Sequence, residues 1–236
     1  AKQRALSVVV NNVFNRRTCS TFGCPSYPNH SICFYDVDEF PGVEGFVALT
    51  IDDAPCPLGR QNSMVKRVQN LLQEFEAFAT FFLVGKFADG HEDDLVDLLR
   101  HGHEFGNHAM LDKAYHNDSM VEFADAVDAC SQKILDLQEL AGVPEGVSWF
   151  RAPHAKYTPA MEDIIAERGL HHVLCDTYAC CPVIQDGAFI GESLAKSARH
   201  GSIIVIHMPS VGVREWCYDG LVHLLIGLRH KGLRPV

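Results

Sequence analysis

An α/β fold built on a parallel sheet is the fold class that the sequence predicts. Apolar runs of strand length alternate with longer segments whose apolar residues have helical spacing. Such alternation produces right-handed βαβ units and therefore parallel strands. Charged residues and histidines follow several of the apolar runs directly, at the strand ends where α/β folds carry their sites. The length of 236 residues suits a single domain of this kind.

Regular elements are expected from Gly45 onward, whereas residues 1–45 are expected to form an irregular N-terminal extension packed on a domain of residues 46–236. Strands are expected at 46–51, 79–84, 147–150, 171–175, 202–207 and 233–236, with 102–108 as a short strand or loop. Helices are expected at 63–76, 92–101, 119–140, 159–168, 192–199 and 214–230. Asp118 or Ser119 is suited to cap the longest helix.

The chain is acidic, with a formal net charge of −10. An acidic surface is unsuited to nucleic acid, to an anionic membrane or to an acidic polymer, so none of these is an expected partner. A neutral or weakly cationic glycan matches the charge better. No run of the sequence approaches the ~18 apolar residues of a membrane span.

Nine cysteines are many for a cytosolic enzyme. Two clusters stand out: Cys19, Cys24 and Cys33, and then Cys175, Cys180 and Cys181. Neither cluster has the paired spacing of a zinc site, so we expect disulfides and a secreted or extracellular protein, with association to a cell wall as one form of this. Buried thiols in a reducing compartment are the alternative. The odd count leaves at least one cysteine free or paired between chains.

Two adjacent carboxylates, Asp52 and Asp53, follow the first apolar run within the segment T-I-D-D-A-P at 50–55. Neighbouring carboxylates repel each other, and a cation would relieve this repulsion. One carboxylate could then bind the metal ion while the other stays free as a base. A simple turn is the alternative, because Asp and Pro favour turns.

His108 and Asp112 are four residues apart, with His116 beyond them. One helical turn would place the first two on the same face, a spacing that suits two ligands of one metal ion. The same spacing also occurs in solvated surface pairs.

Arg151 and His207 each come at the end of an expected strand. A fixed guanidinium can orient a neighbouring carboxylate through bidentate hydrogen bonds. A histidine at the mouth of a buried strand is well placed for proton transfer near neutral pH. Taken alone, a histidine such as His207 is more often a hydrogen-bonded core residue.

Together, these segments resemble the polysaccharide deacetylases of carbohydrate esterase family four, which share the NodB homology domain. The resemblance runs from about Val47 to the C-terminus. Residues 50–55 resemble the family block T-F-D-D-G-P, with Ile51 for Phe and Ala54 for Gly, and A-T-F-F-L-V-G at 79–85 matches A-T-F-F-V-x-G. Three further segments resemble the blocks G-H-E-x-G-N-H, R-x-P-aromatic and G-S-I-x-L-x-H, namely residues 102–108, 151–154 and 202–207.

The resemblance implies a distorted (β/α) barrel of seven or eight strands and a metal-dependent hydrolase of C–N amide bonds. It makes Asp52 the general base, Asp53 and His108 metal ligands, Arg151 the residue that orients Asp52, and His207 the general acid. A divalent metal ion is the implied cofactor, with Zn²⁺ expected first.

Two positions depart from the family pattern. The second metal-binding histidine, four residues after the first, is replaced by Asp112. A carboxylate there still ligates Zn²⁺ but makes the site harder, so Co²⁺ or Mn²⁺ would compete better, and His116 is a spare candidate ligand. The aspartate that supports the acid histidine in the family falls near Cys181 by spacing, and Asp176 is the closest carboxylate that could substitute.

The implied reaction removes N-acetyl groups from an N-acetylglucosamine glycan and releases acetate. Chitin or chitooligosaccharides are the expected substrates, with peptidoglycan and acetylxylan as alternatives. Metal-activated water would lose its proton to Asp52, and the oxyanion would be stabilised near Pro153 and His154 by the metal and a backbone N–H. His207 would protonate the leaving nitrogen. A carbohydrate-binding protein that keeps the fold without catalysis is the alternative from another class.

Overall fold

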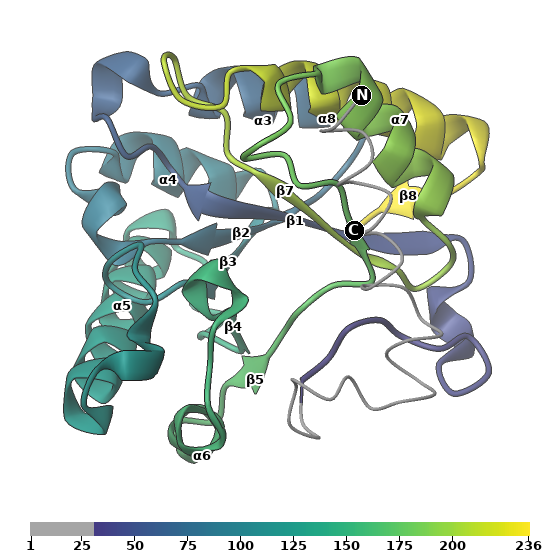
Figure 1. Cartoon of the computed structure of the whole chain (residues 1–236). Helices are drawn as coiled ribbons and strands as arrows, with labels where there is room; N and C mark the ends of the chain where they lie inside the picture. The colour runs from purple at the N-terminus through teal and green to yellow at the C-terminus, as the bar shows by residue number, and fades with distance from the viewer. Residues whose placement is uncertain (1–30) are drawn as a thin grey trace.

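The structure, a computed structural model, describes residues 31–236. Its centre is an eight-stranded parallel sheet with strand order β5-β4-β3-β2-β1-β7-β6, and β8 is also paired to β1. The strands are β1 (Phe46–Ala54), β2 (Thr80–Leu83), β3 (Glu104–Asn107), β4 (Trp149–Phe150), β5 (His171–His172), β6 (Thr177–Tyr178), β7 (Ile203–His207) and β8 (Arg234–Pro235). The sheet curls into a half-barrel with helices around it (Figure 1). This confirms the α/β class and the distorted barrel of seven or eight strands.

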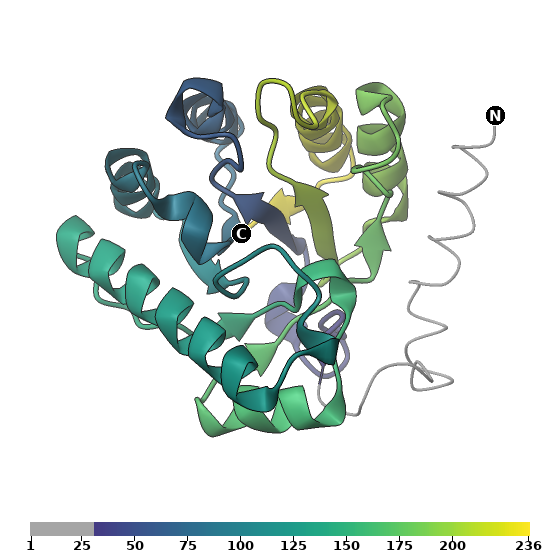
Figure 2. The same cartoon turned by 60° about the vertical axis from the view of Figure 1, so that its left-hand side comes forward.

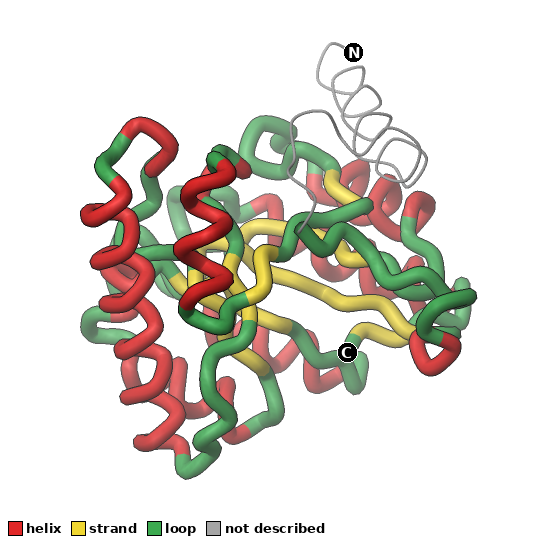
Figure 3. Tube along the Cα trace, turned by 90° about the horizontal axis from the view of Figure 1, so that it is seen from below, coloured by secondary structure: helices red, strands yellow, loops and turns green. Residues whose placement is uncertain are grey.

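Helices cover the outside of the curled sheet, and the strands lie within this layer (Figures 2 and 3). The α-helices of the described chain are α3 (Val65–Glu74), α4 (Glu92–Arg100), α5 (Met120–Ala141), α6 (Pro159–Glu167), α7 (Gly187–Ser197) and α8 (Trp216–His230). Each presents an apolar stripe inward, as helical spacing of apolar residues requires. In α3, for example, Val65, Val68 and Leu72 are buried. None of the helices within residues 31–236 is both long and apolar enough to cross a membrane.

The central strand β1 carries functional side chains because its two faces differ. Leu49 and Ile51 are fully buried in the core beneath the helices. Thr50 and Asp52 alternate with them and therefore face the inside of the half-barrel. The strand also runs beyond its expected end at residue 51, because its parallel pairing with β7 continues to Asp52 and its pairing with β2 continues to Ala54.

Helix α7 begins five residues earlier than the expected 192–199 segment. The Asp186 side chain accepts a hydrogen bond from the Phe189 N–H and caps the helix at this earlier point. Two glycines, Gly187 and Gly191, weaken the helical pattern in the sequence but are required by close packing on α8. A Cβ atom on Gly191 would lie 2.4 Å from the Gly220 carbonyl oxygen.

Helix α5 begins with a capping box, which decides between the two expected caps. The Ser119 hydroxyl accepts from the Glu122 N–H, and the Glu122 carboxylate accepts from the Ser119 N–H. Ser119 is therefore the N-cap, and Asp118 lies outside the helix. The short strand β6 is absent from the expected elements, since two residues of pairing are too few to produce a pattern in the sequence.

The expected extension 1–45 is described only from residue 31, and its part over residues 1–30 lies outside the described chain. Ile32 bridges the segment after β5: its N–H donates to the His172 oxygen at 2.9 Å, and its oxygen accepts from the Leu174 N–H at 2.8 Å. Tyr35 donates in turn to the Gly201 oxygen at 2.9 Å. The chain from 31 to 35 thus lies beside the half-barrel between the ends of the strand order.

The expected disulfide framework is not found in the described chain. No two of its cysteines are joined, and Cys19 and Cys24 lie outside the described residues. In the second cluster, Cys181 instead uses its sulfur as a hydrogen-bond partner of His207, at 3.1 Å from Nδ1. The sequence could not show this, because it gives no contact between residues so far apart.

Acid sensitivity is expected from His103, a buried imidazole in the segment before β3. Its ring packs against Phe81 and Phe78 with centroids 5.5 and 6.2 Å apart, and its Nδ1 has no hydrogen-bond partner among the described residues. Burial, helped by the charge of His101, lowers the pKa of His103 to about 4. The folded state therefore keeps this ring neutral at a pH where the unfolded chain binds a proton.

The free energy of unfolding should fall as pH drops from 6.5 towards 4, and His103 should contribute about 2 kcal/mol of the loss at pH 5. Replacement of His103 by Gln should remove that part of the pH dependence. Urea unfolding at pH 7 and pH 5 measures it, with the exposed His230→Gln as control. An unchanged difference between the two pH values in His103→Gln would contradict the assignment.

Candidate active site

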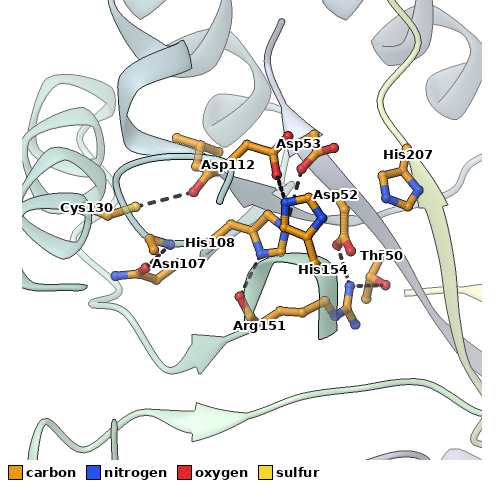
Figure 4. Close-up of polar contacts among 12 residues, drawn as sticks. Thr50, Asp52, Asp53, Asn107, His108, Asp112, Cys130, Arg151, His154 and His207 are labelled. Carbon is orange, nitrogen blue, oxygen red and sulfur yellow. Dashed lines mark hydrogen bonds and ion pairs between the residues drawn. The ribbon is translucent and has the colours of Figure 1, made fainter. Parts of the chain in front are cut away.

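A pocket of about 500 Å³ opens at the carboxyl ends of the central strands. Figure 4 shows most of its polar side chains. The residues that define its chemistry come from strand ends and from the loops that follow: Asp52, Asp53, His108, Asp112, Arg151, His154, His207 and Arg214. The pocket thus gathers side chains from segments up to 160 residues apart, as expected where parallel strands end on one edge.

Asp52 is held by Arg151 at the base of the pocket. Both side chains are buried, and Arg151 NH1 lies 2.6 Å from Asp52 Oδ1. The same nitrogen donates to the Thr50 hydroxyl at 2.8 Å, which itself donates to the Ile204 oxygen. The contact is made through one nitrogen, so one carboxylate oxygen of Asp52 is left outside the pair with Arg151.

The remaining donors of Arg151 are directed at backbone carbonyls. Nε donates to the Val173 oxygen at 3.1 Å, and NH2 donates to the Leu174 oxygen at 2.9 Å. The guanidinium also lies over the Phe82 ring, 4.0 Å from its centroid. With its donors distributed in this way, the cation has one defined position, and so has the Asp52 oxygen that it holds.

Asp53 is shared between a histidine and a second arginine. Its Oδ1 lies 3.5 Å from His108 Nε2, and its Oδ2 lies 2.6 Å from Arg214 NH1. Burial by itself raises the pKa of Asp53, but the His108 hydrogen bond and the charges of His207, His108 and Arg214 outweigh it and hold the pKa well below the usual value. Asp53 is therefore a carboxylate at any physiological pH.

The contact of Nδ1 determines the tautomer of His108. Nδ1 lies 2.6 Å from the Arg151 carbonyl oxygen, which can only accept, so Nδ1 carries a hydrogen. In the neutral ring the lone pair is then on Nε2, the atom that faces Asp53. A backbone carbonyl that fixes a histidine in this way is the usual support of a metal ligand.

Asp112 lies on the same pocket but is turned to another partner. Its Oδ1 is 3.2 Å from His154 Nε2, and both side chains are partly exposed. Within residues 31–236, no three His, Cys, Asp or Glu side chains converge as a ready metal-binding group. The predicted ligand set is thus only partly assembled, since Asp53 and His108 face each other and Asp112 does not join them.

The donor set of Asp53 and His108 nevertheless fits a divalent cation. A carboxylate oxygen and a neutral imidazole nitrogen 3.5 Å apart leave room for an ion at about 2.0–2.2 Å from each. Asp112 would complete the set as a third oxygen ligand if its carboxylate left His154. Such a mixed set of N and O donors suits Zn²⁺, Co²⁺ or Mn²⁺.

Strained backbone gathers around the pocket. Asp53, Ala109, His154 and Arg214 all have left-handed φ values between 56° and 60° although none is glycine. Such residues are uncommon and persist only where the surrounding structure enforces them, which happens most often at functional sites. The strained backbone therefore indicates a functional site at the same pocket that the polar side chains define.

The comparisons with known proteins agree with this geometry. The family model described as polysaccharide deacetylase matches residues 41–173, which is more than half of the chain. The chain belongs to the polysaccharide deacetylase family.

Relatives and solved structures extend this result. The chain is 27% identical to a peptidoglycan-N-acetylglucosamine deacetylase of Bacillus cereus, over 84% of this chain and 88% of that protein. It is 30% identical to a chitooligosaccharide deacetylase of Azorhizobium caulinodans, over 68% and 72% of the two chains. The crystal structure of BA3943, a CE4 family pseudoenzyme from Bacillus anthracis, superposes with a TM-score of 0.70 at 16% identity, covering 89% of this chain and 67% of that one. The half-barrel is therefore the NodB-type fold of this family.

The support of His207 in this family member differs from the prediction. The Asp176 carboxylate accepts from the Ser202 hydroxyl and from the Ile203 N–H, at 3.0 and 3.1 Å. Instead, Cys181 lies 3.1 Å from His207 Nδ1, and its sulfur also accepts from the His207 N–H at 3.3 Å. The prediction of Asp176 as the partner is corrected to Cys181.

Burial explains the state of this pair. It raises the pKa of the Cys181 thiol well above its usual value, so the sulfur is a neutral thiol. Burial alone would lower the pKa of His207, but Cys181 and the carboxylates of Asp53 and Asp52 raise it. The pKa of His207 is thus raised by its neighbours in spite of its burial.

Two other predicted residues lie outside the pocket lining. His116 belongs to the 3-10 turn η4 (Tyr115–Asn117), and Pro153 is buried at the start of η5 (Pro153–Ala155). Arg214 is a site residue that sequence reasoning missed. In the sequence it is only the first residue of an expected helix, and no local pattern shows that the chain turns there through a positive φ and directs the side chain to Asp53.

Loss of the Arg151 charge should strongly destabilise the fold. Arg151→Met leaves Asp52 as a buried carboxylate without its cation, so the free energy of unfolding should fall by about 3–5 kcal/mol. Urea unfolding measures the loss. Arg168→Met is the matched control, because Arg168 pairs with Asp128 at the surface and its loss should cost no more than about 1 kcal/mol. Equal losses in the two variants would contradict the importance of this buried pair.

Proposed function

We propose that this chain is a metal-dependent deacetylase that removes N-acetyl groups from an N-acetylglucosamine glycan, with chitin or chitooligosaccharides as the substrate. The observation that carries the proposal is the pairing of Asp52 with His207. These two residues are direct partners in the parallel register of β1 and β7, and both line the pocket. A fixed carboxylate and an imidazole on the same pocket supply a base and an acid for hydrolysis.

Asp52 acts as the base that takes a proton from the attacking water. Arg151 holds one of its oxygens and leaves the other able to accept. Because the arginine is buried and hydrogen-bonded through all three of its nitrogens, the carboxylate does not have to reorganise during the reaction.

Asp53 and His108 would hold the metal ion, with Asp112 as third ligand and Zn²⁺ as the metal expected first. When bound, such an ion supplies a water of lowered pKa and polarises the acetyl oxygen. Two carboxylates, Asp53 and Asp112, make the site harder than one with two histidines, which supports Co²⁺ or Mn²⁺ as alternatives.

His207 acts as the acid that protonates the departing sugar nitrogen. Its ring is positioned by Cys181 at Nδ1, which directs Nε2 away from the sulfur. The carboxylates of Asp52 and Asp53 favour the protonated ring. The amine that leaves then departs as a neutral or protonated group rather than as an anion.

The choice of substrate rests on relatives and charge. One relative is named for peptidoglycan N-acetylglucosamine and another for chitooligosaccharide, and both names share an N-acetylglucosamine unit. The net charge of −10 disfavours binding of peptidoglycan, an acidic polymer that carries peptides. It favours chitin, a glycan that becomes cationic as its acetyl groups are removed. Chitin or its oligomers therefore lead, and peptidoglycan and acetylxylan follow.

A carbohydrate-binding role without catalysis is the second candidate. The observation that favours it is that two expected metal ligands are already paired within the chain. Arg214 pairs with Asp53, and His154 pairs with Asp112. The fold also occurs in a protein described as a pseudoenzyme. A pure binding protein, however, has no need for Asp52, Arg151 and His207 in their present arrangement.

Acetate release from the N-acetylglucosamine pentamer tests the proposal. The metal-free protein is assayed with added Zn²⁺, Co²⁺ or Mn²⁺ and again with a chelator. Asp52→Asn should lower kcat at least about a hundredfold, whereas the surface variant Asp136→Asn should not change it. Activity that survives both the chelator and Asp52→Asn would refute this mechanism, and oligomer binding without acetate release under any metal would favour the second candidate.

The role of Cys181 gives a separate prediction. Cys181→Ala removes the partner of His207 Nδ1, so kcat should fall about tenfold or more while KM stays nearly constant, since the imidazole acts in the transition state. Cys56→Ala, which also removes a buried sulfur, serves as the control for general destabilisation. Equal kcat values in Cys181→Ala and Cys56→Ala would mean that the Cys181 contact has no catalytic effect.

A further inference from the structure

Each of the carboxylates Asp52, Asp53 and Asp112 is paired with a basic side chain of the described chain. Asp52 pairs with Arg151 and Asp53 with Arg214, both at 2.6 Å, and Asp112 pairs with His154. The first pair belongs to the base of the mechanism above. The second is different, because it places a permanent positive charge on the carboxylate that is expected to bind a metal ion.

Arg214 is built into this position and does not reach it from solvent. Its side chain is only 13% exposed, and its backbone turns through φ 56° just before α8. Nε is buried and has no hydrogen-bond partner within the described chain, so the contact with Asp53 is the principal bond of the guanidinium. Cys181 and Cys217 lie close to it on the protein side.

The two oxygens of Asp53 are thereby divided. Oδ1 faces His108, and Oδ2 is taken by Arg214. A divalent cation on Asp53 would meet both a carboxylate already neutralised by the guanidinium and the repulsion of a like charge a few ångströms away. Metal ion and guanidinium therefore compete for one carboxylate.

We infer that Arg214 is an internal counter-cation of Asp53 that lowers the affinity of this site for divalent metal ions, because its charge neutralises the carboxylate and repels the incoming cation. This inference rests on the proposed function for the identity of the metal ligands. It adds a positioning residue that none of the sequence motifs includes. It also predicts that the metal-free protein is stable, because the site is charge-balanced without an ion.

Metal affinity is the direct test, and it does not depend on catalysis. Zn²⁺ and Co²⁺ binding to the metal-free full chain is measured by isothermal titration calorimetry for the wild type, Arg214→Gln and Arg214→Lys. Arg214→Gln should bind at least about tenfold more tightly, the size of effect expected for a close buried charge pair. Arg214→Lys keeps the charge and should stay within about threefold of the wild type. Arg168→Gln, at a surface pair with Asp128, is the matched control and should leave the affinity unchanged.

Thermal unfolding provides a second measurement on the same variants. Without metal, Arg214→Gln should melt at a lower temperature than the wild type, because Asp53 loses its counter-ion. Saturating metal should raise its melting temperature by more than it raises that of the wild type. In the Asp53→Asn background, Arg214→Gln should bring no gain in affinity.

The outcomes separate this inference from the proposed function. Equal metal affinity of the wild type and Arg214→Gln, or no binding by Arg214→Gln at all, would overturn the role of Arg214. A gain of affinity that persists with Asp53→Asn would overturn it as well, because the metal would then lie elsewhere. Failure of the proposed function would show itself differently, as a lack of acetate release by a wild-type protein with its metal bound.

Discussion

The buried ion pair between Arg151 and Asp52 is the contact on which the rest of the site depends. A guanidinium removed from water is costly unless its donors find partners, and here its three nitrogens reach Asp52, Thr50 and two carbonyl oxygens after β5. These partners belong to β1 and to the opposite wall of the half-barrel. One cation thus both neutralises Asp52 and links β1 to the segment after β5.

The position of that cation also divides the inside of the barrel. The pocket with the polar residues lies on one side of Arg151. On the other side, a second cavity of about 400 Å³ is lined largely by apolar groups and includes Thr50 and Phe82, the two side chains that Arg151 contacts. Arg151 itself lines the polar pocket together with the carboxylates, whereas two of its contact partners line the apolar cavity.

The acidic side chains of the pocket are each paired with a basic side chain, and the pairs differ in burial. Asp52 and Asp53 are deeply buried with their arginines, whereas Asp112 and His154 are partly exposed. Burial makes the first two pairs specific and hard to exchange, and exposure makes the third weak. The same reasoning explains why a neutral thiol can serve beside His207: with carboxylates already on the pocket side, Cys181 fixes the ring without adding a further negative charge.

The sequence alone determined the α/β class, most helices and several residues of the pocket, because apolar periodicity and strand-end motifs are local properties. It predicted the positions of Asp52, Asp53, His108, Arg151 and His207, and all of them line one pocket. It did not predict the early start of α7, whose glycines are explained only by contact with α8.

Partnership across the barrel was decided by tertiary structure alone. Arg214 on Asp53, Cys181 in place of Asp176, and His154 on Asp112 join residues that lie 161, 26 and 42 positions apart. Such pairs depend on strand register and on single turns with positive φ, and neither leaves a pattern in the sequence. A sequence can therefore name the groups that carry charge, but only the folded chain settles which charge faces which.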